Sequence, residues 1–254
     1  MGNRGVNGLR AAIAFLTRIP ASAPSDAGAT SLAWFPVVGA LIGLAGAMAY
    51  AVALLLVPPL LAAALAAAAL VVLTGALHED GLADSADAWG GGSNREDALR
   101  ILHDPAHGTY GVVALVLVLL LRVSAVAAMT ASSALLLLPA AHALSRASMV
   151  AVLVTTPPAR PGGLAAMFGR LASRRASVTA LAGGLVSGLA FAGPIALAFA
   201  AVMGAGAWLV RRLALRSVGG VTGDVLGAVQ QVTETVVLVI GAAVVSAGWG
   251  LGWR

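Results

Sequence analysis

Residues 111–130 read GVVALVLVLLLRVSAVAAMT, an apolar run that contains one charged residue. A transmembrane α-helix needs about 20 predominantly apolar residues to cross the hydrocarbon core of a bilayer. Six further runs of this kind lie at about 36–57, 60–77, 134–154, 178–192, 194–210 and 225–248. The sequence therefore predicts an all-α fold, a polytopic integral membrane helical bundle of about seven spans that forms a single domain over residues 1–254.

The composition of the 254 residues points to the same class. Hydrophobic residues make up 60% of the chain and charged residues 10%, and the mean hydropathy is +0.97. Soluble globular domains carry about 25% charged residues. The chain has no cysteine, which excludes disulfides, thiolate metal sites and cysteine nucleophiles. It also has no lysine, which excludes a lysine Schiff base and the lysine of a phosphate-binding P-loop.

The arginines predict how the chain lies in the membrane. If the N-terminus is cytoplasmic, the connections 1–35, 78–110, 155–177 and 211–224 are all cytoplasmic. These segments hold 12 of the 15 arginines, namely Arg4, Arg10, Arg18, Arg95, Arg100, Arg160, Arg170, Arg174, Arg175, Arg211, Arg212 and Arg216. Short cytoplasmic connections of membrane proteins are enriched in basic residues. The net charge of +5 therefore reflects orientation, and no nucleic-acid partner is expected.

Carboxylates and histidines are concentrated in the connection 78–110. Seven of the 10 acidic residues and three of the four histidines lie there. Asp80, Asp84 and Asp87 follow an i, i+4, i+7 spacing, which places them on one face of a helix. Helix capping explains one aspartate near an N-terminus but not a stripe of three. We therefore predict that these aspartates are catalytic and hold a divalent cation.

Other side chains of this connection are predicted to bind phosphate. His78 has two equally open interpretations. It either lies at the membrane interface without a chemical role, or it serves as a phosphate contact or general base. Arg95 and Arg100 follow three glycines at 90–92, which free the backbone to approach a ligand. Arginine suits bidentate phosphate contacts, so both arginines are candidate phosphate ligands.

The connection ends in a second polar string, residues 103–111. Pro105 and Gly108 make a regular helix there doubtful. We expect a loop in which Asp104 adds a carboxylate and His107 contacts substrate. The alternative is a loop that merely joins two helices.

A third polar string precedes the last apolar run. It contains Thr222 and Asp224 at the predicted cytoplasmic edge, and Glu234 lies two or three turns deeper. A carboxylate within a membrane is unfavourable unless it is paired or functional. Arg146 and His142, spaced i and i+4 in another run, are the predicted partners of Glu234. We count Thr222, Asp224, Arg146 and Glu234 among the predicted substrate-binding residues.

Five motifs taken together resemble the cobalamin synthase family. They are His78-x-Asp80-Gly81-x-x-Asp84-x-x-Asp87, Asp104 followed by Gly108-Thr109-Tyr110-Gly111, Gly220-x-Thr222-Gly223-Asp224-x-x-Gly227, Leu16-Thr17-Arg18-Ile19-Pro20 and Trp34-Phe35-Pro36-x-x-Gly39. They run from about Phe15 to Glu234 in the family's order and at similar spacing. The resemblance implies a membrane-integral, Mg²⁺-dependent adenosylcobinamide-GDP ribazoletransferase, with the first aspartate motif carried onto Asp80, Asp84 and Asp87.

The resemblance also implies a reaction and its partners. Such enzymes join adenosylcobinamide-GDP to α-ribazole or its 5′-phosphate, release GMP and form adenosylcobalamin or its phosphate. The surroundings would be the lipid bilayer of the bacterial cytoplasmic (inner) membrane, with the active site facing the cytoplasm. Phosphoryl transfer requires charge neutralisation and positioning more than a covalent nucleophile. Arg18, Arg95 or Arg100 would bind phosphate, and a carboxylate or His78 would take the hydroxyl proton. Whether the chain forms a homo-oligomer is left open by the sequence.

Two other functions fit parts of the sequence. A CDP-alcohol-type membrane phosphotransferase of phospholipid synthesis also places aspartates around a divalent metal, but Asp84-Ser85 stands where its motif has Ala-Arg. A membrane transporter would need charged groups within spans, as Arg122 and Glu234 are predicted to be. A structural ion pair is an equally open interpretation of Arg122. Against a transporter, the acidic residues gather in one connection rather than along a path across the bilayer.

Overall fold

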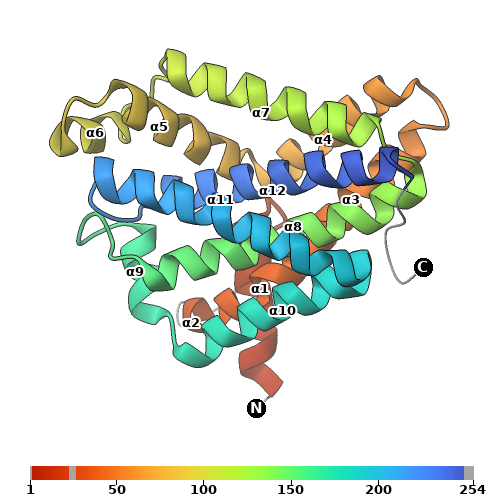
Figure 1. Cartoon of the computed structure of the whole chain (residues 1–254). Coiled ribbons are helices and arrows are strands. Elements are labelled where there is room, and N and C mark those ends of the chain that lie inside the picture. The colour runs from red at the N-terminus through yellow and green to blue at the C-terminus, as the bar shows by residue number, and fades with distance from the viewer. Residues whose placement is uncertain (1, 23–26, 249–254) are drawn as a thin grey trace.

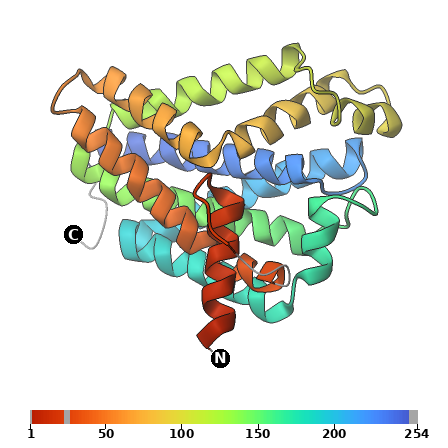
Figure 2. The same cartoon turned by 180° about the vertical axis from the view of Figure 1, so that it is seen from behind.

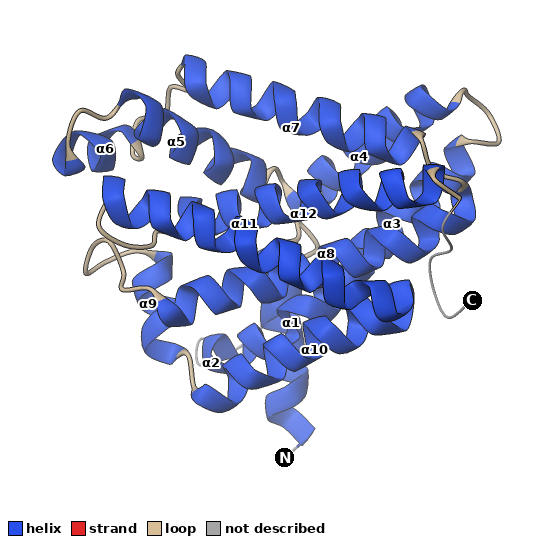
Figure 3. Ribbon diagram, viewed as in Figure 1, coloured by secondary structure: helices blue, strands red, loops and turns tan. Residues whose placement is uncertain are grey.

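The computed structural model describes residues 2–22 and 27–248, most of which lie in helices (Figure 3). Within these residues the only β-type pairing is an isolated backbone bridge between Pro158 and Val221. The elements are α1 (Gly2–Leu16), α2 (Gly28–Ser31), η2 (Leu32–Trp34), α3 (Phe35–Ala53), α4 (Pro59–Thr74), α5 (Leu77–Gly91), α6 (Arg95–Ile101), α7 (Thr109–Ala127), α8 (Ala131–Thr155), α9 (Leu164–Leu171), α10 (Arg174–Ala192), η3 (Gly193–Ile195), α11 (Ala196–Ser217) and α12 (Gly223–Ser246). The predicted all-α class is confirmed.

Several helices are long and apolar enough to cross a membrane. Five such segments are found in the described chain: Leu32–Ala53, Thr109–Ala127, Ala131–Thr155, Arg174–Ser217 and Gly223–Ser246. A sixth is formed if α4 and α5, which are bent by 91° at the break between them, count as one span. The segment Arg174–Ser217 consists of α10 and α11 joined by η3, and these two helices lie side by side (Figure 1). The membrane class is thus confirmed, whereas the count of seven spans and the side of the N-terminus stay predictions.

The long helices run roughly side by side, so their connections gather at two ends of the bundle (Figures 1 and 2). Residues 92–108, 156–163 and 218–222 lie at one end, which we call the polar end. Residues 54–58 and 128–130 lie at the opposite end. Three of the four connections that the arginines assign to one side of the membrane, 78–110, 155–177 and 211–224, therefore have residues at the polar end.

Glycines allow α3 to approach α8, the most enclosed of the candidate spans. A Cβ atom on Gly39 would lie 2.5 Å from the backbone oxygen of His142, and one on Gly43 would lie 2.5 Å from that of Leu138. Such contacts are typical of helix pairs in membranes, where small residues let backbones meet. The close packing holds α8 in the centre of the bundle, where it presents His142 and Arg146 to α12.

The predicted connection 78–110 is largely helical. α4 ends where Gly75 (φ +67°) and Ala76 (φ +57°) adopt left-handed conformations, which turn the chain sharply into α5. The short helix α6 follows. Residues 102–108 form no helix, as Pro105 and Gly108 predicted. The polar string therefore begins as a helix that can carry side chains on defined faces.

α5 runs along the start of α12 because two glycines remove the side chains between them. A Cβ atom on Gly81 would lie 2.7 Å from the backbone oxygen of Asp224, and one on Gly227 would lie 3.1 Å from that of His78. Both distances are shorter than ordinary side-chain contacts, and alanine at position 81 would force the helices apart. The first and third polar strings of the sequence thus meet at the polar end.

Candidate active site

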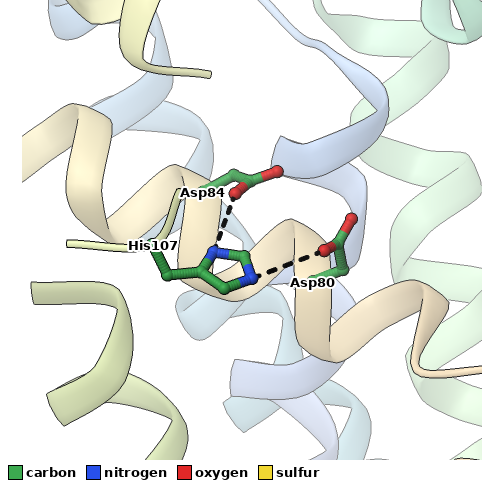
Figure 4. A group of neighbouring side chains, drawn as sticks. All are labelled: Asp80, Asp84 and His107. Carbon is green, nitrogen blue, oxygen red and sulfur yellow. Dashed lines mark ion pairs between the residues drawn. The ribbon is translucent and has the colours of Figure 1, made fainter. Parts of the chain in front are cut away.

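Two of the predicted aspartates and a histidine form a cluster at the polar end. α5 presents Asp80 and Asp84 on one face, and His107 lies between them (Figure 4). The Nε2 atom of His107 is 3.9 Å from Oδ1 of Asp80, and its Nδ1 atom is 3.4 Å from Oδ1 of Asp84. The side chain of Asp80 is 63% exposed and that of Asp84 is 16% exposed, so the cluster opens to solvent beside Asp80. Two neighbouring carboxylates that are open to solvent on one side can bind a divalent cation.

The third predicted aspartate, Asp87, is buried and binds backbone. Its Oδ2 atom accepts a hydrogen bond from the Gly108 amide at 2.7 Å, and its Oδ1 atom accepts one from the Gly111 amide at 2.9 Å. A Cβ atom on Gly108 would lie 2.5 Å from Oδ1 of Asp87, so any larger residue there would displace the Asp87 carboxylate. Asp87 therefore fixes the loop that carries His107. Its role as a metal ligand stays a prediction.

Asp84 lies in a strongly negative environment. Partial burial raises its pKa to about 6, and the charges of Asp80, Asp224 and Asp87 act in the same direction while His107 opposes them. Among the described residues, no arginine comes within 4 Å of the Asp80 or Asp84 carboxylate. A bound cation would relieve this repulsion, so the donor set fits Mg²⁺, which prefers oxygen ligands.

The third polar string joins this cluster through the first turn of α12. Thr222 caps the helix, because its Oγ1 atom accepts a hydrogen bond from the Val225 amide at 3.2 Å. The same hydroxyl donates to Oδ2 of Asp224 at 3.2 Å. The Asp224 carboxylate interacts electrostatically with Asp80 and Asp84. Thr222 and Asp224 therefore lie beside the predicted metal ligands, as the sequence suggested.

Glu234 lies in the core and is enclosed by donors. Its side chain is fully buried and belongs to α12. Its carboxylate pairs with the predicted partners Arg146 and His142, and also with Arg122, Gln230 and Ser145. The predicted pairing of Glu234 with Arg146 and His142 is confirmed. Both Glu234 and Arg146 are closed off from solvent, so their contact with substrate stays a prediction.

Arg122 extends this network toward the acidic cluster. Besides Glu234, its guanidinium contacts Oε1 of Gln231 at 2.7 Å and Oε1 of Glu79 at 3.6 Å. Arg122 therefore forms ion pairs within the bundle, as one of the two interpretations of this residue expected. Glu79 thus points to Arg122 rather than to the face of α5 that carries Asp80 and Asp84. The buried network therefore links α5, α7, α8 and α12.

His78 lies inside the protein, away from the solvent-facing cluster. It is 2% exposed, and its Nε2 atom has no hydrogen-bond partner within the described chain. A cavity of about 30 Å³ adjoins it, lined mainly by apolar side chains that include Phe15, Phe35 and Phe168. The interfacial interpretation does not describe this position, because the residue is buried. Its role as a base or phosphate contact stays a prediction.

The predicted phosphate clamps occupy three different positions. Arg18 lies against Gly75 at the break between α4 and α5. The guanidinium of Arg95 donates to two backbone oxygens, and that of Arg100 pairs with Asp97 at 2.7 Å on the exposed side of α6. The exposed Asp104 accepts a hydrogen bond from the Ala106 amide at 3.0 Å. None of these contacts tests phosphate binding.

The sequence interpretation missed Arg160. It used Arg160 only as one of the arginines that orient the connection 155–177, whereas the structure shows it half-buried, and its charge acts on the Asp224 carboxylate. Its Nη1 atom lies 3.4 Å from Nδ1 of His103. The prolines at 157, 158 and 161 indicate a connection with a restricted backbone. Only the fold shows that this connection is hydrogen-bonded to the residues before α12.

The chain is similar to proteins of one enzyme family along nearly all of its length. The family model described as cobalamin-5-phosphate synthase matches residues 8–242. An adenosylcobinamide-GDP ribazoletransferase of Bradyrhizobium diazoefficiens is 45% identical over 241 residues, which cover 92% of this chain and 93% of the relative. Proteins with the same name from Ralstonia nicotianae and Pseudomonas aeruginosa are 44% and 43% identical, covering 89% and 91% of this chain and 91% and 96% of their own lengths. No solved structure matches the chain. The chain therefore belongs to the cobalamin-5-phosphate synthase family.

Proposed function

We propose that this chain transfers the cobinamide phosphate group of adenosylcobinamide-GDP to α-ribazole or α-ribazole 5′-phosphate and releases GMP. The names of the relatives support this activity, and the groups at the polar end suit it. We also propose that the chain lies in the bacterial inner membrane with its polar end in the cytoplasm, where nucleotides are found. The arginine-rich connections at that end support the orientation.

The proposed reaction forms one bond and breaks one bond. A hydroxyl oxygen of the acceptor bonds to the phosphorus that carries the cobinamide group. The bond from that phosphorus to the bridging oxygen of the pyrophosphate breaks, and GMP leaves with this oxygen and its electron pair. The hydroxyl proton passes to His107, which is exposed and has a carboxylate beside each ring nitrogen.

The observation that carries the proposal is the meeting of Asp80, Asp84 and His107 at an opening of the polar end. Asp80 and Asp84 would hold Mg²⁺, and Asp87 fixes the loop that places His107 between them. The bound ion would neutralise the pyrophosphate and the charge that develops on GMP. Asp224, beside the two aspartates, adds a carboxylate whose position is fixed by the cap of α12.

Turnover by the purified chain tests the proposal. We would incubate detergent-purified protein with adenosylcobinamide-GDP, Mg²⁺ and either α-ribazole or its 5′-phosphate, and follow GMP and the corrinoid product by chromatography. Equal amounts of GMP and product are expected with at least one acceptor. Failure of a helical, monodisperse preparation with both acceptors would contradict the proposal. A CDP-activated lipid as donor would then test the phospholipid-type alternative.

A further inference from the structure

The connection before α9 rests on the turn before α12. The Ala159 amide donates to the Val221 oxygen at 3.0 Å, and the Val221 amide donates to the Pro157 oxygen at 2.9 Å. A Cβ atom on Gly220 would collide with the same Pro157 oxygen. The two stretches of backbone can therefore approach only because residue 220 is glycine, and the backbone next to Arg160 has a defined place.

Arg95 of α6 fastens the same two stretches together. Its Nε atom donates to the Val218 oxygen at 3.0 Å, and its Nη2 atom donates to the Ala159 oxygen at 2.6 Å. Hydrogen bonds from a guanidinium are stronger than those between neutral groups. One donor of Arg95 thus positions residue 159, directly before Arg160, and another holds residue 218 beside it.

Arg160 itself has donors that the structure leaves free. The Nδ1 atom of His103 lies 2.7 Å from the Leu99 oxygen, which requires this nitrogen to carry a proton. A protonated nitrogen cannot accept a hydrogen bond, so the contact of Arg160 with it at 3.4 Å leaves the guanidinium unsatisfied. Within the described residues no carboxylate lies within 4 Å of Arg160.

The charge of Arg160 nevertheless reaches the acidic cluster. Arg160 follows Ala159, whose amide donates to the oxygen of Val221, three residues before Asp224, and the Asp224 backbone lies against Gly81, between Asp80 and Asp84. Burial raises the pKa of the Asp224 carboxyl, and the charge of Arg160 opposes this shift. Arg160 differs in this respect from Arg100, whose guanidinium is neutralised by Asp97. A half-buried guanidinium with free donors beside a carboxylate cluster is suited to an anion that bridges the two.

We propose that Arg160 binds the pyrophosphate of the nucleotide donor at the Asp80–Asp84 cluster. This inference rests on the proposed function. A pyrophosphate brings negative charge to a site that is already acidic, so a positive side chain beside the cluster adds to the neutralisation that the cation would provide. The planar guanidinium can bind two phosphate oxygens at once, and its backbone is fixed before the donor arrives.

Binding of GDP, the part of the donor that includes the pyrophosphate, tests the role of Arg160 apart from turnover. We would compare Arg160→Gln, Arg160→Lys and the matched control Arg170→Gln by calorimetry with GDP and Mg²⁺. Arg170 also lies at the polar end but donates to the Pro161 oxygen and is exposed. Arg160→Gln should weaken GDP binding about 10-fold or more, as expected for lost hydrogen bonds to a charged group. Arg160→Lys should retain part of the affinity, and Arg170→Gln should bind as the unchanged chain does.

Kinetics should separate donor from acceptor. Arg160→Gln should raise KM for adenosylcobinamide-GDP and leave KM for α-ribazole unchanged. Unchanged GDP affinity in Arg160→Gln would overturn the proposal. So would full recovery of GDP affinity in Arg160→Gln combined with Asp224→Asn, because Arg160 would then only neutralise Asp224. If the unchanged chain binds GDP but never turns over, the proposed function fails while the GDP result for Arg160 stands. If it does not bind GDP at all, both fail.

Discussion

Glu79 on α5 lies 3.6 Å from the guanidinium of Arg122 on α7, and the same guanidinium pairs with Glu234 on α12. Glu79 directly precedes Asp80, so the buried network ends one residue from the aspartate cluster. Three helices from distant parts of the sequence are thereby tied together below the polar end. We interpret this network as the support that fixes how α5 turns its aspartates toward His107.

Removal of the Glu234 charge should destabilise the protein strongly. In Glu234→Gln, Arg122 and Arg146 remain buried with less compensating charge. Breaking a buried ion pair by removing one partner typically destabilises by about 3–5 kcal/mol. Thermal unfolding in detergent measures the effect, with Glu96→Gln on the exposed surface of α6 as control. Equal unfolding temperatures for Glu234→Gln and the control would contradict the structural role of the network.

Asp87→Asn should loosen the loop that carries His107. An asparagine can accept from one of the two amides of Gly108 and Gly111, but its NH₂ group then faces the other. An unsatisfied buried donor destabilises by about 1–3 kcal/mol. Hydrogen exchange should therefore speed up at the amides of residues 108 and 111 and stay unchanged in α10. Exchange as slow as in the unchanged chain would show that Asp87 does not hold the loop.

The raised pKa of Asp84 predicts that cation binding depends on pH. The folded, metal-free protein favours the neutral form of the Asp84 side chain. Asp84 therefore contributes fully to the free energy of unfolding below pH 3.8, its ordinary pKa, and this contribution is lost as the pH rises through about 6. A cation requires the ionised carboxylate and must displace the proton at low pH. The apparent affinity for Mg²⁺ should fall about tenfold per pH unit below this pKa and level off above it. Calorimetric titrations on both sides of pH 6 measure the profile, and the same profile in Asp84→Asn would exclude Asp84 as its source.

Alanine at position 81 should separate the two halves of the site. The added methyl group would lie 2.7 Å from the Asp224 backbone oxygen, so α5 and α12 would have to move apart. Overpacking of this kind destabilises by about 1–3 kcal/mol, and activity should fall as well. Gly183→Ala is the matched control, because a Cβ atom there meets nothing within 4 Å. An equal loss of stability in both variants would contradict this prediction, because it would show that alanine destabilises each helix rather than the contact between α5 and α12.

Hydropathy was sufficient to predict the membrane class, because an apolar run of bilayer length with few charges is typical of a transmembrane helix. The spacing of Asp80 and Asp84 predicted their shared face, and the helix α5 provides it. The pairing of Glu234 with Arg146 and His142 followed from the unfavourable energy of an isolated buried charge. Each of these predictions depends on local periodicity or on a single strong energetic rule.

Contacts between distant segments could not be predicted in this way. Asp87 shares the spacing of Asp80 and Asp84, but its carboxylate binds the Gly108 and Gly111 amides, a structural role that helical spacing does not show. The position of Arg160 beside Asp224 depends on Gly220 and on Arg95, whose contacts exist only once α6 and α12 have met. The sharp bend at Gly75 and Ala76 likewise has no signal as strong as the prolines that separate α3 from α4.

The central claim is that Asp80 and Asp84 hold the cation that supports transfer to the acceptor. The most direct test is a Mg²⁺ titration of GMP release from adenosylcobinamide-GDP for the unchanged chain, for Asp84→Asn and for the surface control Glu96→Gln. We predict saturable dependence on Mg²⁺ for the unchanged chain and the control, loss of activity on chelation by EDTA, and no turnover by folded Asp84→Asn at any Mg²⁺ concentration. GMP release by Asp84→Asn with an unchanged Mg²⁺ dependence would contradict the claim.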